Sequence, residues 1–164
     1  MIKKIVLIYL LLESALLAFP PMGYHKYVSI GMGVTQSDSY SGGLDFISTD
    51  IGIKSEYDKI YINMNNINYD EDNDIGAFSY TINYDKFIYN EYNKKIYIGS
   101  GIGMVEIGND DKIFARRLYL NLKSGIIYDF TMHWSINAGL NYWFTNYPGF
   151  RNTFGFLTSL EYQF

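Results

Sequence analysis

The chain has 164 residues, which suits a single domain. It contains no cysteine, which excludes a disulfide framework, a thiolate metal site and a cysteine-linked lipid anchor. Its formal net charge of -4 gives no electrostatic basis for binding nucleic acid. Aromatic residues make up 18% of the chain. That share is high for a soluble domain of this size and is typical of a membrane barrel with a belt of aromatic residues at each membrane interface.

Residues 1–23 are predicted to be a secretory signal peptide, and residues 24–164 to be the mature domain. Lys3 and Lys4 form a positively charged start, and the apolar stretch 5–12 follows them. This stretch is too short to span a membrane comfortably, so an uncleaved anchor helix is the weaker interpretation. Candidate cleavage positions are Ala15, Ala18 and Gly23.

From Tyr27 onward, apolar and polar residues alternate almost everywhere, which predicts amphipathic β-strands. The alternation is strongest in the stretch 133–144 and weakest in the stretch 60–69. Eight strands of about ten residues are expected, and this length suits a tilted membrane crossing. The expected strands cover residues 27–35, 44–55, 60–69, 75–84, 96–107, 113–127, 133–144 and 153–164.

The seven connections are predicted to alternate between the two sides of the membrane. An even number of strands places both termini on the periplasmic side. The expected external connections are 36–43, 70–74, 108–112 and 145–152. The expected periplasmic connections are 56–59, 85–95 and 128–131, of which 85–95 is unusually long.

The last residues of the chain form an extended stretch with Phe154, Phe156, Leu160, Tyr162 and Phe164 on one face. A soluble domain seldom ends on an open, Phe-rich edge strand, because the unpaired edge invites aggregation. A closed barrel in lipid removes that edge and exposes the apolar face to hydrocarbon. A soluble β-sandwich that happens to end in Phe is the alternative.

Two motifs resemble a known family. Leu160, Tyr162 and Phe164 resemble the terminal signal of bacterial outer-membrane β-barrels, and the run 97–103 resembles the glycine-rich strands of small barrels of the OmpA/OmpX/opacity-protein type. The resemblance implies an all-β, eight-stranded, antiparallel up-and-down transmembrane barrel in the outer membrane. It also implies that the barrel-assembly machinery reads the terminal signal.

The glycine-rich run 96–103 could be mistaken for a phosphate-binding loop. It lies on a strand with a period of two, and no helix pattern follows it, so a nucleotide site is not expected. Glycines on one face of this strand are expected to leave room for bulky inward groups such as Tyr97 and Tyr119.

The inward face of the predicted barrel is small or polar. Eight strands leave an interior that side chains fill or that holds one small ligand. Buried charges should pair, because an isolated charge is costly there. This network has two interpretations: a structural ion-pair core, which we favour, or a gate on a narrow polar path. The charges expected to pair are Asp50, Lys54, Arg117, Lys123 and Glu161.

His133 and Ser135 raise one enzymatic hypothesis. Outer-membrane lipid A deacylases carry a His-x-Ser pair on a barrel strand with a carboxylate further on, and such a pair can activate a hydroxyl nucleophile. The matching stretch 142–152 has no Asp or Glu, and His133 falls near the periplasmic end, so we expect an ordinary inward histidine and no enzyme. His25 and His133 make no convincing metal site, and no cofactor is expected.

The expected function is a structural or surface-interaction role, adhesin- or antigen-like, for a monomer in the bacterial outer membrane. Its expected partners are outer-membrane lipids, including lipopolysaccharide, and the barrel-assembly machinery during biogenesis. A narrow channel for small or apolar solutes is the alternative, and no wide pore is expected.

Overall fold

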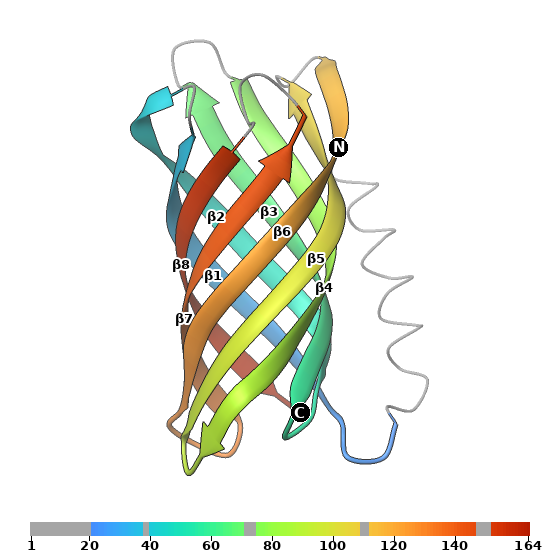
Figure 1. Ribbon diagram of the computed structural model, residues 1–164, viewed down its shortest axis with the longest axis vertical. Helices are drawn as coiled ribbons and strands as arrows, with labels where there is room; N and C mark the ends of the chain where they lie inside the picture. Colours follow the sequence, from blue (N-terminus) through green and yellow to red (C-terminus); the bar gives the residue numbers. More distant parts are fainter. Residues whose placement is uncertain (1–20, 38–39, 71–74, 109–111, 147–151) are drawn as a thin grey trace.

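The computed structural model describes residues 21–37, 40–70, 75–108, 112–146 and 152–164. They form an antiparallel sheet in which each strand pairs with its sequence neighbours, and the first and last strands pair to close a barrel (Figure 1). The predicted eight-stranded up-and-down barrel is confirmed. The strands are β1 (His25–Ser37), β2 (Tyr40–Lys54), β3 (Asp58–Asp70), β4 (Ile75–Glu91), β5 (Lys94–Gly108), β6 (Ile113–Asp129), β7 (Trp134–Thr145) and β8 (Asn152–Gln163).

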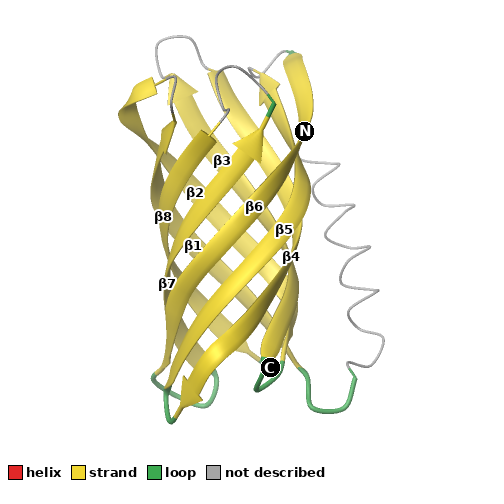
Figure 2. Ribbon diagram, in the orientation of Figure 1, coloured by secondary structure: helices red, strands yellow, loops and turns green. Residues whose placement is uncertain are grey.

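The predicted signal peptide lies outside the described residues, except for positions 21–23, which precede β1. No helix within the described ranges is long and apolar enough to cross a membrane. Strands run the full height of the molecule, joined by short loops at one end (Figure 2).

Side chains alternate between the outside and the inside of the barrel, as the sequence period predicts. Outward apolar residues such as Met32 and Leu118 are 73% and 68% exposed. Inward residues such as Asn63 and Thr81 are buried. A closed barrel leaves no unpaired strand edge, and its apolar exterior is suited to contact with the hydrocarbon of a membrane rather than with water.

The long connection predicted at residues 85–95 is wrong. β4 continues to Glu91 and β5 begins at Lys94, so only Tyr92 and Asn93 form the turn. An irregularity in the pairing between Phe87 and Tyr89 shifts the register within this hairpin. Among the polar residues that suggested a loop here, Asp85 is buried in the lumen, whereas Lys86, Asn90 and Glu91 are exposed.

Other strands also extend beyond their predicted ends. β3 begins at Asp58, so Lys59 belongs to a strand and not to a turn. β6 continues to Asp129, which moves the predicted turn 128–131 to residues 130–133. β2 begins at Tyr40 and β3 ends at Asp70. The physical reason is that strands of a barrel pass beyond its apolar band, where their residues become polar and lose the amphipathic pattern.

The segment before β1 and the last residue of the chain are both tied to one end of the barrel, here named the base; the opposite end is named the rim. The Tyr24 hydroxyl donates to Asp58 (2.8 Å), which ties the segment before β1 to β3. This hydrogen bond raises the pKa of the Tyr24 phenol. The backbone N–H of Phe164 donates to the Lys26 carbonyl (2.9 Å), which fixes the last residue beside β1.

Candidate functional site: the filled barrel interior

A buried lysine occupies the centre of the polar half of the interior, toward the base. The Lys59 ammonium lies 3.6 Å from Asp85 and 3.6 Å from Glu161. Its nitrogen is also 4.9–5.5 Å from the ring centroids of three tyrosines. Aromatic faces attract a cation, so rings and carboxylates together replace the water that the ammonium loses. The tyrosines are Tyr27, Tyr61 and Tyr97.

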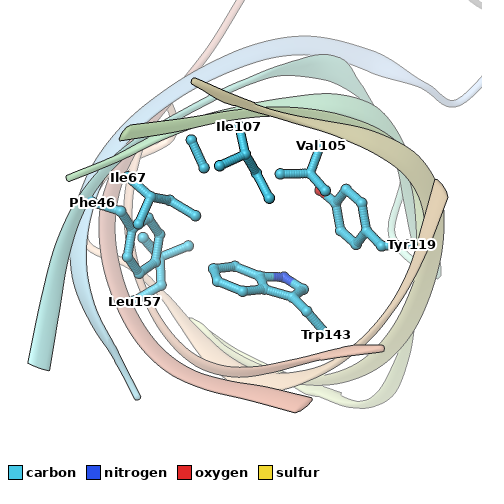
Figure 3. Close-up of a cluster of buried hydrophobic side chains, with 8 residues drawn as sticks. Phe46, Ile67, Val105, Ile107, Tyr119, Trp143 and Leu157 are labelled. Atoms are coloured by element: carbon cyan, nitrogen blue, oxygen red, sulfur yellow. The ribbon is translucent and has the colours of Figure 1, made fainter. Parts of the chain in front are cut away.

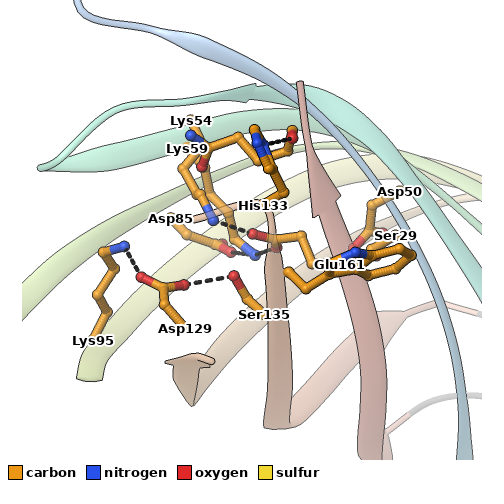
Figure 4. Close-up of polar contacts among 12 residues, drawn as sticks. Ser29, Asp50, Lys54, Lys59, Asp85, Lys95, Asp129, His133, Ser135 and Glu161 are labelled. Carbon is orange, nitrogen blue, oxygen red and sulfur yellow. Dashed lines mark hydrogen bonds and ion pairs between the residues drawn. The ribbon is translucent and has the colours of Figure 1, made fainter. Parts of the chain in front are cut away.

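Two further lysines complete the balance of charge around Lys59. Lys54 forms an ion pair with Glu161 from the opposite end of the chain (Figure 4). Lys123 donates to the Tyr61 hydroxyl (2.8 Å), which in turn donates to Asp85 (2.8 Å). Among the described residues, the buried charges are three lysines and three carboxylates. Such a balanced interior offers no net charge to attract a permeating ion.

The third carboxylate, Asp50, is held by neutral donors. The Ser29 hydroxyl donates to it (2.8 Å), and the Asn63 amide donates to it (2.6 Å). Asn63 also donates to Ser48 (2.7 Å), so hydrogen bonds link β1, β2 and β3 across the lumen wall. Hydrogen bonds to a buried carboxylate replace the hydration lost on burial.

A second ion pair lies nearer the base. Lys95 pairs with Asp129, and the Ser135 hydroxyl donates to the same carboxylate (2.5 Å) (Figure 4). This pair joins β5, β6 and β7 and is less buried than the central network. Below it, a cavity of about 480 Å³ opens between the segment before β1 and the first turn of the base. Its lining includes Tyr24, Lys54, Asp58 and Lys95, whose polar ends are already partnered.

Glycines allow the large inward side chains to fit. A Cβ built at Gly139 would lie 2.4 Å from the Tyr97 hydroxyl, and one at Gly125 would lie 2.5 Å from it. A Cβ at Gly99 would collide with Asp85. The prediction that glycines of β5 make room for Tyr97 is therefore wrong in detail. Tyr97 fills space left by glycines on β6 and β7, and β5 makes room for the polar side chains of β4.

An apolar cluster fills the other half of the interior, toward the rim. Trp143 and Phe46 make an edge contact with ring centroids 5.6 Å apart, and the cluster side chains converge in the lumen (Figure 3). The hydroxyl of Tyr119 forms a hydrogen bond with Thr81 at the lower edge of the cluster. The cavity beside Trp143 is only about 10 Å³, close to the volume of one water probe. The buried members are Phe46, Ile67, Ala77, Val105, Ile107, Tyr119, Trp143 and Leu157.

The structure brings together four of the five charges predicted to share a network. Lys54 and Glu161 pair directly, and Asp50 and Lys123 are buried around the same centre. Arg117 is the exception: it is exposed at the rim, and its guanidinium donates to the Arg116 carbonyl (2.9 Å). Arg117 has the inward parity of β6, but it lies beyond Tyr119, the last β6 residue that pairs with β7 among the described residues, so its side chain is open to water.

Sequence reasoning missed the two residues at the centre of the network. The sequence predicts connections at Lys59 and Asp85, but each lies on a strand and is fully buried. One signal could have found them. Lys59 keeps the two-residue spacing with Tyr61 and Asn63, and Asp85 keeps it with Asn83 and Thr81.

The His133 and Ser135 side chains face different partners. His133 is exposed in a base turn, with Nδ1 3.0 Å from the Gln163 carbonyl, so the expected inward orientation is wrong. Ser135 is buried and directs its hydroxyl to Asp129. Among the described residues, no group of three His, Cys, Asp or Glu side chains could hold a metal ion.

The terminal residues form an aromatic patch on the outside of the base. Tyr162 packs against Trp134 with ring centroids 4.7 Å apart and against Phe164 at 5.1 Å. Leu160 and Phe164 are 40% and 62% exposed. All three residues of the predicted assembly signal therefore face outward, where another protein or lipid can reach them.

No protein-family model and no curated protein matches this sequence. Solved structures do match it. Neisserial surface protein A (NspA) superposes with a TM-score of 0.71 at 13% identity, covering 87% of this chain and 97% of that one. The chain has the fold of a small outer-membrane β-barrel. This confirms the predicted resemblance at the level of the fold.

Two other solved structures have the same fold. The N-terminal barrel domain of Pseudomonas aeruginosa OprF matches with a TM-score of 0.64 at 13% identity, covering 86% of this chain and 99% of that one. Ail, the attachment invasion locus protein of Yersinia pestis, matches with a TM-score of 0.55 at 10% identity, covering 86% and 97%. Ail was crystallised with the heparin analogue sucrose octasulfate.

Proposed function

We propose that this protein is a monomeric, integral β-barrel of the bacterial outer membrane that acts as a structural or surface-contact protein and not as an enzyme or an open pore. The observation that carries the proposal is that two separate groups of side chains fill the lumen. A charge-balanced network around Lys59 fills the half toward the base, and the apolar cluster around Trp143 fills the half toward the rim.

Conductance tests the filled lumen. The protein reconstituted in planar bilayers is expected to show no stable, large conductance steps, because an ion would have to cross both the ion-pair network and the apolar cluster. A matched variant that removes bulk from the cluster, Trp143→Ala with Phe46→Ala, tests whether that barrier matters. Large and stable conductance of the unmodified protein would contradict the proposal.

A narrow channel for small solutes is the second candidate, and the cavity of about 480 Å³ at the base favours it as an entry vestibule. A solute entering there would next meet the network around Lys59 and then the apolar cluster. Uptake of small solutes into protein-containing vesicles, faster than into empty ones, would support this candidate over the sealed barrel.

Surface contact is the more specific part of the proposal. Two proteins with this fold, a surface protein and an attachment protein, support such a role here by analogy of fold alone. The proposed partners are the surrounding lipids, and the barrel-assembly machinery through Leu160, Tyr162 and Phe164. Cells that display the protein should adhere to a surface or host polymer better than cells without it.

Lipid A deacylation finds no support in the interior geometry. Ser135 donates its hydroxyl to Asp129 and His133 faces the Gln163 carbonyl, so the histidine is not placed to take the serine proton. Mass spectrometry of lipid A from overexpressing cells is expected to show unchanged acylation.

A further inference from the structure

A groove crosses the outer wall of the barrel from β3 to β6. It has a volume of about 430 Å³. Ser100 forms its floor because this small residue lies between the larger Tyr84 on β4 and Leu122 on β6. The groove walls face outward and are mostly apolar: Ile60, Ile82, Tyr84, Ile102, Leu120 and Leu122.

Two of these strands, β5 and β6, carry a charged pair nearer the rim. Arg116 Nε donates to Glu106 (2.7 Å), and the arginine side chain is 56% exposed. Both residues have outward parity, two pairs above Ile102 and Leu120. Phe78 on β4 lies beside Glu106, and Phe114 on β6 is exposed on the rim side of Arg116. Aromatic residues concentrate at membrane interfaces, so this pair lies at headgroup level.

The spacing of these two features fits one lipid molecule. Glu106 lies six positions after Ser100, which is roughly 20 Å along a strand. With a strand tilt of about 40°, that corresponds to about 15 Å of depth. Half of a hydrocarbon core about 30 Å thick has the same depth. A headgroup at Arg116 would therefore place the end of its acyl chain at the groove over Ser100.

We propose that the β3–β6 wall binds a phosphorylated lipid of the outer leaflet, with its phosphate on Arg116 and one acyl chain in the groove over Ser100. Glu106 holds the guanidinium through Nε, and the exposed remainder of the group faces the headgroups. A guanidinium recognises phosphate through parallel N–H donors. The proposal rests on the proposed outer-membrane location and orientation but not on the sealed lumen.

Native mass spectrometry of the purified mature barrel tests this site, with diphosphorylated lipid A as the probe. The unmodified protein is expected to retain one lipid A. Ser100→Leu fills the groove and should reduce the retained fraction about tenfold. Arg116→Gln should reduce it by a similar factor for diphosphorylated lipid A and leave binding of the dephosphorylated form unchanged.

Ser124→Leu is the matched control. Ser124 is also a small, exposed residue on β6, but it lies outside the groove, so its replacement should leave lipid A binding unchanged. Each variant must keep heat-modifiable gel migration, which shows that the barrel is folded. The proposal is overturned if Ser124→Leu weakens binding as much as Ser100→Leu, or if Arg116→Gln affects both forms of lipid A equally. The conductance test of the sealed lumen is independent of both outcomes, so failure of the lipid site would leave that part of the proposed function standing.

Discussion

Buried charged residues in the interior stabilise one another by forming ion pairs. Glu161 is the acceptor that two lysines share, since it pairs with Lys54 and lies 3.6 Å from Lys59. Removing one partner of a buried ion pair leaves the other charge without compensation, which costs about 3–5 kcal/mol. The neighbours of Glu161 matter more for stability than any surface charge.

Glu161→Gln is therefore expected to lower the free energy of unfolding by about 3–5 kcal/mol. Urea-induced unfolding of the refolded protein in lipid vesicles measures this loss. Glu91→Gln is the matched control, because Glu91 is exposed at the β4–β5 turn and should change stability by less than about 0.5 kcal/mol. Equal, small effects of both variants would show that the network contributes little.

A second residue-scale prediction concerns the close approach of Tyr97 to Gly139. Gly139→Ala places a methyl group 2.4 Å from the Tyr97 hydroxyl and should destabilise the barrel by about 1–3 kcal/mol. Tyr97→Phe removes that hydroxyl and should recover most of the loss in the double variant. A double-mutant cycle from the same unfolding assay measures the coupling; additive effects would disprove the collision.

At the scale of single elements, the β4–β5 hairpin contains a residue in an unfavourable backbone conformation. Tyr92 has φ 53°, in the left-handed region that disfavours most L-residues. Asn tolerates this region better, so Tyr92→Asn should raise the free energy of unfolding by about 0.5–1 kcal/mol. Tyr57→Asn is the control, since Tyr57 is also an exposed base tyrosine but has negative φ. Stabilisation by both variants would trace the effect to lost tyrosine exposure and not to the turn.

In the terminal strand, the contribution of Phe164 to the stability of the barrel can be measured separately from its recognition by the assembly machinery. Phe164 keeps its backbone hydrogen bond to Lys26 whatever its side chain, so Phe164→Ala should change the stability of the refolded barrel by less than about 1 kcal/mol. The amount of folded protein in the membrane of cells should nevertheless fall severalfold if the residue is an assembly signal. Phe130→Ala removes another exposed base aromatic and should leave that amount unchanged. A parallel fall in both measurements would assign Phe164 a purely structural role.

Strand faces could be predicted from the sequence, whereas strand ends could not. The alternation of Trp134, Ile136 and Leu140 with buried Ser135, Asn137 and Gly139 is local and survives in the fold. At the ends of strands, the exterior side chains become polar as well, so the stretch around Asp85 has the composition of a loop. The two-residue spacing of Asp85 with Asn83 fits an inward position, but whether the strand continues to Asp85 depends on pairing with β3 and β5.

Arg117 shows a second limit of prediction from sequence spacing. Its parity on β6 is inward, yet burial depends on its height in the barrel, which follows from strand tilt and stagger rather than from sequence spacing. The network could be predicted in kind from the rule that buried charges pair. The spacing of Lys59 with Tyr61 fits an inward position, but its place at the centre of the network could not be predicted, because that place depends on three tyrosines from β1, β3 and β5.

The described part of the molecule combines an apolar exterior with an interior that is filled by the polar network and the apolar cluster. The exterior carries exposed aliphatic and aromatic side chains such as Ile30, Leu118 and Phe156, and the sheet has no open edge. Water would be a poor solvent for that surface, and hydrocarbon a good one. The closed sheet should also resist detergent until it is heated, because unfolding requires the loss of all strand pairings together.

Heat-modifiable migration of the protein from isolated outer membranes tests this central claim most directly. The unboiled sample in detergent should run as a separate band from the boiled sample, because the folded barrel stays compact. The account predicts that this folded band is found in the outer-membrane fraction. Recovery of the protein in the soluble fraction, with the same migration before and after boiling, would contradict it.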